Sequence, residues 1–145
     1  MKKFYALILL LMAFIMAPTN GKSQCKPFAK KVCEKELTPY IHDGNYHVSI
    51  LSEGETAKIY KTLDAHKNYR IYVCGSENIP GIHFQVKDRN QTVIYDNKND
   101  DYKTKWDFVP DSSQEVLISL KVDNSTKESE IPVSGCVSVM IGVKD

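Results

Sequence analysis

The sequence has little of what a catalytic centre needs. Only four of its 145 residues are histidines, and no Gly-x-Ser-x-Gly segment is present to expose a nucleophilic serine. A nucleophile also needs a base that a third group holds in place. The histidines have no metal-binding spacing and are predicted to lie at the surface or in loops: His42, His47, His66 and His83. We therefore expect a protein that is not an enzyme. A hydrolase that gathers His42 or His47 with carboxylates is the rival hypothesis.

An excess of positive charge is also lacking. The chain has 19 basic and 18 acidic residues, and loss of the first 23 residues would remove Lys2, Lys3 and Lys22. The remaining 16 basic and 18 acidic residues give a net charge of −2 with neutral histidines. No basic stripe is left to neutralise a row of phosphates, so we expect no nucleic-acid partner.

The one long apolar run lies at the start of the chain. Two lysines precede Phe4–Ala17, and small residues follow it, as in a secretory signal peptide. The run is too short to cross a hydrocarbon core of ~30 Å comfortably. We therefore expect a signal peptide at 1–23, cleavage before Gln24, and a single domain at 24–145 that does not span the membrane. The expected location is secreted, periplasmic or cell-envelope.

All four cysteines lie after the predicted cleavage site, and their spacing fits no compact metal-binding pattern: Cys25, Cys33, Cys74 and Cys136. An even number in a small exported domain predicts two disulfides. Cys74 and Cys136 share the parity of the polar residues in their strands, which favours a Cys74–Cys136 bridge and leaves Cys25 for Cys33.

A second pairing stays open because Pro27–Lys35 is typical of a short helix, with the proline in its first turn. Eight helical residues span ~12 Å, whereas the Cα atoms of a disulfide lie ~4.4–6.8 Å apart. Unless that helix is short or broken, both bridges would instead attach the N-terminal segment to the sheet.

Short runs with alternating apolar residues, separated by turn residues, dominate the rest of the chain. Three such runs between Tyr69 and Asn97 are interpreted as a β-meander. The other predicted strands are Tyr46–Leu51, Thr56–Leu63, Lys105–Val109, Gln114–Val122 and Cys136–Val143. The expected fold class is all-β, an antiparallel β-sandwich or jelly roll of about eight strands with one short N-terminal helix.

The order of these features resembles the bacterial pre-peptidase C-terminal domain, a small jelly-roll-like β-sandwich. The matching segments include Ser52-Glu-Gly-Glu-Thr-Ala, Asn68-Tyr-Arg-Ile-Tyr-Val, Phe84 to Asn97 and Trp106-Asp-Phe-Val-Pro. The mature chain also resembles a group of small uncharacterised secreted proteins of Bacteroidota-type bacteria. The resemblance implies a non-catalytic accessory module; some members of that family bind collagen or polysaccharide, at times with calcium.

The sequence offers two candidate ligand sites. Trp106 and Tyr102 could form a platform on which a sugar stacks, although Trp106 is also interpreted as a core residue. Hard oxygen ligands of the kind that calcium takes cluster at Asp96, Asn97, Asn99, Asp100 and Asp101, where a solvated loop is the plainer interpretation. No cofactor is expected otherwise.

Together these patterns predict an exported, disulfide-stabilised binding or envelope-associated module. The expected partner is a surface glycan or an envelope protein. The alternative is a structural or protein-interaction module with no small ligand.

Overall fold

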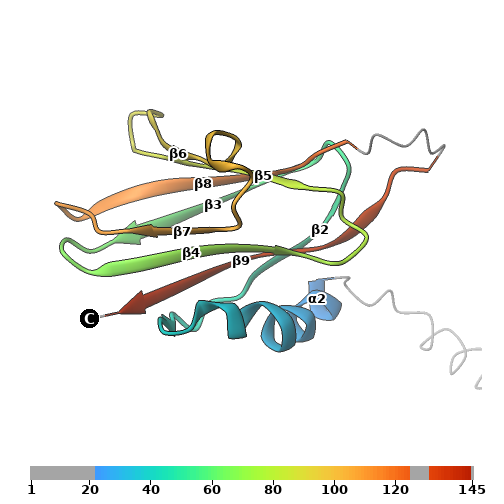
Figure 1. Cartoon of the computed structure of the whole chain (residues 1–145), viewed down its shortest axis with the longest axis horizontal. Helices are drawn as coiled ribbons and strands as arrows, with labels where there is room; N and C mark the ends of the chain where they lie inside the picture. Colours follow the sequence, from blue (N-terminus) through green and yellow to red (C-terminus); the bar gives the residue numbers. More distant parts are fainter. Residues whose placement is uncertain (1–21, 125–130, 145) are drawn as a thin grey trace, which may run out of the picture.

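The computed structural model describes residues 22–124 and 131–144, which form a two-sheet antiparallel β-sandwich with one helical segment on its outside (Figure 1). The predicted all-β sandwich is confirmed. Most of the predicted signal peptide, 1–23, lies outside the described residues. No helix in the described part of the chain has the length and apolar character needed to cross a bilayer.

The first sheet is built around the long strand β9 (Ser134–Lys144). Along one edge it pairs with β4 (Asn68–Gly75), which in turn pairs with β7 (Lys105–Phe108). Along its other edge it pairs in succession with β2 (His47–Ser52) and the two-residue β1 (Ile41–His42).

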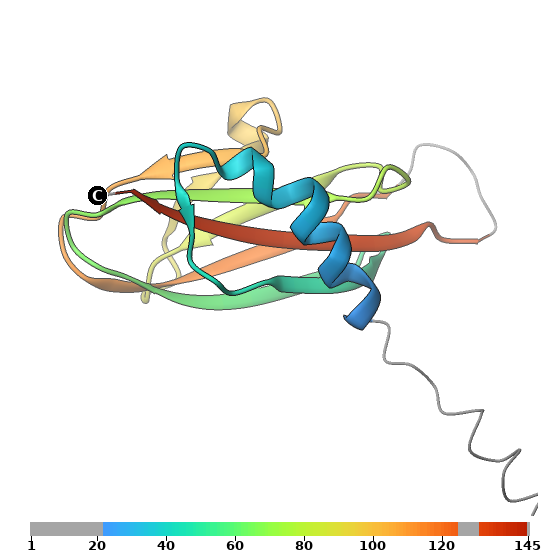
Figure 2. The same cartoon turned by 90° about the horizontal axis from the view of Figure 1, so that it is seen from below.

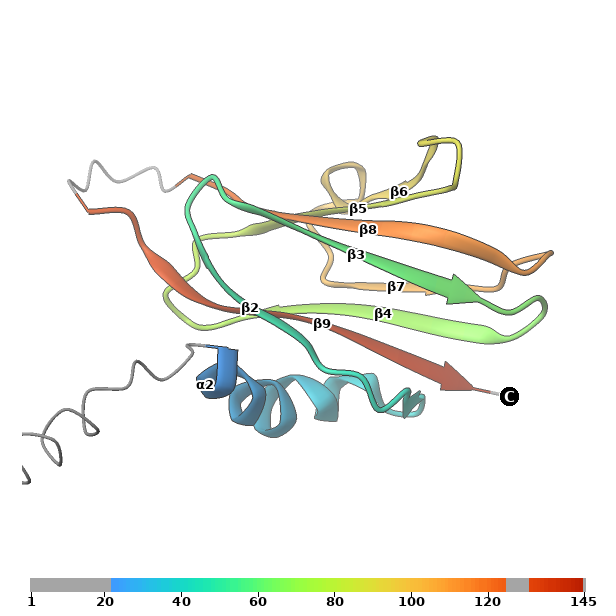
Figure 3. The same cartoon turned by 180° about the vertical axis from the view of Figure 1, so that it is seen from behind.

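The second sheet has the order β3-β8-β5-β6 and lies over the first (Figure 3). Its strands are β3 (Thr56–Leu63), β8 (Gln114–Val122), β5 (Ile82–Lys87) and β6 (Val93–Asp96). Successive side chains of a strand point to opposite faces, so alternate residues of both sheets fill the space between them. Phe84, Ile71, Ile118 and Ile141 are completely buried in this core.

A continuous helical segment covers the outer face of the first sheet (Figure 2). It consists of α2 (Lys22–Phe28), a π-helical turn η2 (Ala29–Cys33) and a 3₁₀ turn η3 (Glu34–Leu37). The predicted helix is therefore present, but Pro27 lies inside it and not in its first turn. Its inner face packs against Met140 and Cys74 of the sheet in a second, smaller core.

The favoured disulfide pairing is wrong. The bridges are Cys25–Cys136 and Cys33–Cys74, with Cα separations of 5.4 and 5.9 Å. Cys74 and Cys136 do share the outer face, but Cys74 lies opposite Ser138. Cys136 is thus a diagonal neighbour of Cys74, and diagonal neighbours are ~7–8 Å apart, beyond disulfide reach. The helical spacing of ~12 Å keeps Cys25 and Cys33 apart as well.

The interpretation of residues 69–97 as one meander is also wrong in its first half. β5 and β6 form the expected hairpin, but β4 and β5 belong to different sheets. Both edges of β4 are already taken by β9 and β7. The segment 76–81 therefore carries the chain across the end of the sandwich and helps to form the site described next.

Candidate functional site: a cleft at one end of the sandwich

A cleft of about 920 Å³ lies where the connection between β4 and β5 passes from one sheet to the other. Its volume falls within the range of sites that bind ligands or partner side chains. The lining combines apolar, polar and acidic residues: Glu53, Val73, Gly75, Ser76, Glu77, Asn78, Ile79, Pro80, Gly81, Ile82, Tyr102, Thr104, Asp123, Asn124 and Val133.

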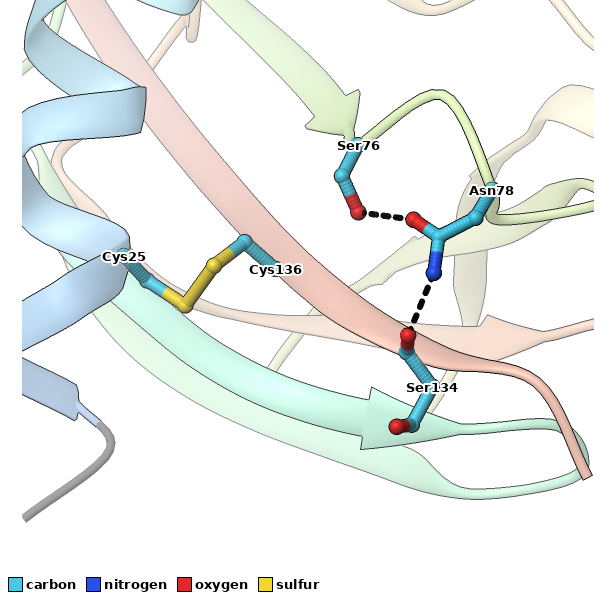
Figure 4. Close-up of a disulfide and its surroundings, with 5 residues drawn as sticks. All are labelled: Cys25, Ser76, Asn78, Ser134 and Cys136. Atoms are coloured by element: carbon cyan, nitrogen blue, oxygen red, sulfur yellow. Dashed lines mark hydrogen bonds between the residues drawn. A yellow bond between two sulfur atoms is a disulfide. The ribbon is translucent and has the colours of Figure 1, made fainter.

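The β4–β5 loop is held firmly against β9 (Figure 4). Within the loop Ser76 Oγ donates to Asn78 Oδ1, and Asn78 Nδ2 donates to the Ser134 carbonyl. The Ser76 N–H donates to the carbonyl of Cys136 over 2.9 Å. Because Cys136 is bonded to Cys25, this loop rests on a strand that is covalently linked to the helix.

The close approach of this loop to β9 depends on Gly135. A Cβ atom there would collide with Ser76 Oγ and would lie 2.9 Å from Asn78 Oδ1, so any other residue would push these side chains out of their hydrogen bonds. The loop conformation is therefore fixed by side-chain hydrogen bonds, a disulfide-linked strand and one glycine. Contacts that hold a wall of a cleft in one conformation reduce the entropy lost when a ligand binds.

The opposite wall comes from the β2–β3 turn and the end of β8. The Glu53 N–H donates to the Val133 carbonyl and the Gly54 N–H to the Val122 carbonyl. The Asp123 N–H donates to the Gly81 carbonyl over 3.0 Å, which closes the ring of loops around the cleft. Glu53 Oε1 is buried and has no hydrogen-bond partner.

Tyr102 stands at the cleft with 44% of its surface exposed. Its φ is +54°, and that of Asp101 is +49°, so two consecutive non-glycine residues adopt the left-handed conformation. Such residues carry a conformational cost and occur often at functional sites. The Tyr102 N–H bonds the Asn97 carbonyl over 2.8 Å, which holds the turn in place.

Two of the predicted calcium residues, Asp96 and Asp100, are hydrogen-bonded to other groups of the protein. Asp96 accepts bonds from Gln85, His83 and the Lys98 N–H. Burial opposes its ionisation, but these three bonds outweigh burial and hold the pKa of Asp96 below its usual value. Asp100 accepts from Lys103, which is the largest cause of its lowered pKa, and from Tyr95.

Two more residues of the predicted cluster, Asn99 and Asp101, are exposed. Within residues 22–124 and 131–144, no group of three or more histidine, cysteine, aspartate or glutamate side chains is arranged to hold a metal.

Asn97 serves as an internal anchor. Its side chain is completely buried; Oδ1 accepts the Phe84 N–H, and Nδ2 donates to the carbonyls of Ile82 and Lys103. The bond to Ile82 connects this anchor to the β5 end of the cleft. The Asx-rich segment thus fixes the chain from η4 (Asn97–Asp100) to Tyr102.

The structure does not bring Trp106 and Tyr102 together in one site. Trp106 stacks between Tyr95 and Phe108, with ring centroids 4.8 and 4.7 Å away, and packs against the main core. Of the predicted pair only Tyr102 lines the cleft. Glu53, Asn78 and Asp123 were not predicted, and their only signal in the sequence is their place in turns.

The histidines are dispersed. His42 bonds the Asn45 carbonyl, and His83 bonds Asp96. His47 lines a second, smaller groove of about 360 Å³ between β2 and β3. Its Nε2 is buried without a partner, and burial is the main cause that lowers the pKa of His47. His42 Nε2 also lies 3.8 Å from Asp43 Oδ1.

Comparison with known proteins finds a likeness among solved structures. No family model matches the sequence, and no curated protein matches it. Among solved structures, the chain is similar to the crystal structure of PliG from Aeromonas hydrophila, a periplasmic inhibitor of g-type lysozyme. The TM-score is 0.50 at 14% identity, and the match covers 73% of this chain and 89% of that chain. At this identity the likeness concerns the fold.

Proposed function

We propose that this chain is an exported, non-catalytic module that binds another protein through the cleft end of its sandwich. The observation that carries the proposal is the cleft itself, because a hydrogen bond ties its β4–β5 loop to β9 and Tyr102 stands exposed beside it. Tyrosine is enriched among the residues that dominate protein–protein binding energy. The two disulfides suit an oxidising compartment outside the cytoplasm, and they support export.

The structural neighbour supplies the first partner to test. PliG is described as a periplasmic inhibitor of a g-type lysozyme, and it shares this fold. Function does not follow from fold, so g-type lysozyme is chosen by analogy with this neighbour as the first partner to test. In this proposal the chain would act by occupying a surface of its partner and would perform no chemistry.

A glycan is the second candidate ligand, because Tyr102 lies in the same cleft as Asn78, Asp123 and Asn124. An aromatic face beside amide and carboxylate groups is an arrangement on which a sugar can stack and form hydrogen bonds. It also agrees with the polysaccharide binding that the resemblance to the pre-peptidase C-terminal domain implies. The accessory role implied by that resemblance stays a prediction.

Calorimetric titration of the secreted chain separates the two candidates. One cell would contain g-type lysozyme, and a second would contain soluble peptidoglycan fragments; lysozyme activity would be followed in parallel by the clearing of a cell-wall suspension. We expect binding to the enzyme, slower clearing and no heat from the fragments. Heat from the fragments alone would replace the protein-binding proposal by the glycan one, and no heat from either would reject lysozyme as the partner.

Two tyrosine variants test whether the partner binds at the cleft. Tyr102→Asn keeps a residue that tolerates positive φ, and it should weaken binding about tenfold or more. Tyr60→Thr is the control: Tyr60 is 64% exposed on β3, does not line the cleft, and threonine suits a strand. It should leave the affinity within about twofold. Equal losses in both variants would contradict binding at the cleft.

A further inference from the structure

The charged residues of the cleft all have the same sign. Glu53, Glu77 and Asp123 line it, and among its described lining residues there is no lysine, arginine or histidine. They come from three separate connections between strands, so the fold alone brings them together. Several carboxylates around one hollow lower the local potential and favour a positively charged occupant.

Glu53 differs from the other acidic residues of its turn. Glu55, two residues further on, accepts the Ser52 N–H through Oε2 at 2.7 Å. Glu53 Oε1 is buried and has no such partner. Glu53 as a whole is half-buried, and a carboxylate oxygen that is removed from water is usually hydrogen-bonded. The cleft therefore contains an acceptor for which the described part of the chain provides no donor.

We propose that the cleft receives an arginine side chain from a loop of the partner protein, with its guanidinium group hydrogen-bonded to Glu53. This inference rests on the proposed function, since it specifies the chemistry by which the cleft recognises a partner. The guanidinium group supplies several N–H donors in a fixed plane, which can bond both oxygens of one carboxylate together.

Arginine is favoured over lysine by the rest of the lining. A planar guanidinium group can stack on the Tyr102 ring, and it sheds its hydration more readily than an ammonium group. The methylene groups of its side chain can pack on Ile79, Ile82 and Val133. The volume of about 920 Å³ leaves room for the neighbouring residues of a partner loop.

The test is an NMR titration of the ¹⁵N-labelled secreted chain with the capped peptide Gly-Gly-Arg-Gly-Gly. The matched peptide has citrulline, which keeps the shape of arginine and lacks its charge. We expect saturable shifts confined to the amides of 75–82, Glu53 and Tyr102, and affinity for citrulline lower by about tenfold. Equal binding of both peptides, or no saturable shift up to about 20 mM peptide, would overturn the proposal.

Glu53→Gln is the variant that tests the contact. Glu115→Gln is its control, because it makes the same change in charge at a residue that is exposed on β8 and does not line the cleft. We expect Glu53→Gln to weaken binding of the arginine peptide about tenfold and to leave Tm within about 1 °C. Glu115→Gln should leave the affinity within about twofold. A lower Tm with unchanged affinity in Glu53→Gln would show instead that Glu53 has a structural role, and the proposal would fail.

Two further outcomes separate this inference from the proposed function. If lysozyme binds the native chain and Glu53→Gln equally well, the arginine contact is rejected while protein binding stands. If the arginine peptide binds at the cleft but lysozyme does not bind, the chemistry of the cleft stands and the choice of partner is rejected. A response of the same amides to calcium chloride, with none to the peptide, would identify a cation site and overturn the proposal.

Discussion

Removing the Cys33–Cys74 bridge by the double substitution Cys33→Ala and Cys74→Ala should destabilise the protein strongly. The bridge closes a loop with a sequence separation of 41 residues. Loop-closure entropy for that length corresponds to ~4 kcal/mol at 25 °C, against ~5 kcal/mol for the separation of 111 residues closed by Cys25–Cys136. Small domains are stable by only ~5–15 kcal/mol, so either loss is large.

Urea unfolding of the native chain and of this double variant measures the difference. We expect the variant to lose ~2–5 kcal/mol while its two-sheet core persists. A loss below ~1 kcal/mol would refute the reasoning, because the helical segment would then be held to the sheet by packing alone.

The pairing itself is tested by the single variant Cys33→Ala. Its unpaired thiol should be that of Cys74, found by alkylation in denaturant followed by peptide mapping without reduction. Labelling at Cys25 would restore the rival pairing, in which Cys74 is bonded to Cys136.

Two further predictions concern the segment that supports Tyr102. Asn97→Ala should lower the free energy of unfolding in urea by ~3 kcal/mol, because the buried N–H of Phe84 and two carbonyls lose their partner. The control Asn99→Ala, at an exposed position, should lower it by less than ~0.5 kcal/mol. Equal losses in the two variants would contradict the anchoring role of Asn97. Burial and then the hydrogen bond to Asp100 raise the pKa of Tyr95 to about 12, so the folded state retains this proton longer than the unfolded state does. The resulting stabilisation is complete below the unfolded pKa of ~10 and is lost as pH rises from there towards 12. Tyr95→Phe should therefore flatten the decline of the unfolding free energy over this pH range. An unchanged decline in the variant would contradict this role of Tyr95.

The strands could be predicted because their signal is local. Alternating apolar residues marked Thr56–Leu63 and Gln114–Val122 with the bounds that the structure has. The pairing of β4 could not be predicted in the same way. The turn residues after Gly75 suit a hairpin and a crossing between sheets equally well, and only the competition of β9 and β7 for the edges of β4 decides between them.

The disulfides illustrate the same limit. Strand parity placed Cys74 and Cys136 on one face correctly, but the two-residue offset between them depends on the register of β4 against β9, which no local pattern encodes. The cleft was harder to predict than the disulfides. Glu53, Asn78 and Asp123 are far apart in sequence and lie in turns, where polar residues are common for conformational reasons. Tyr102 was predicted as a ligand-binding residue, but its predicted companion Trp106 packs in the core.

The most direct test of protein binding at the cleft end is an NMR footprint of the ¹⁵N-labelled secreted chain with g-type lysozyme added in steps. If the cleft end is the binding surface, the amides that shift or broaden first will belong to the β4–β5 loop, to Tyr102 and to Asp123–Asn124. A footprint on the outer face of the helical segment, or on the groove between β2 and β3, would contradict the account.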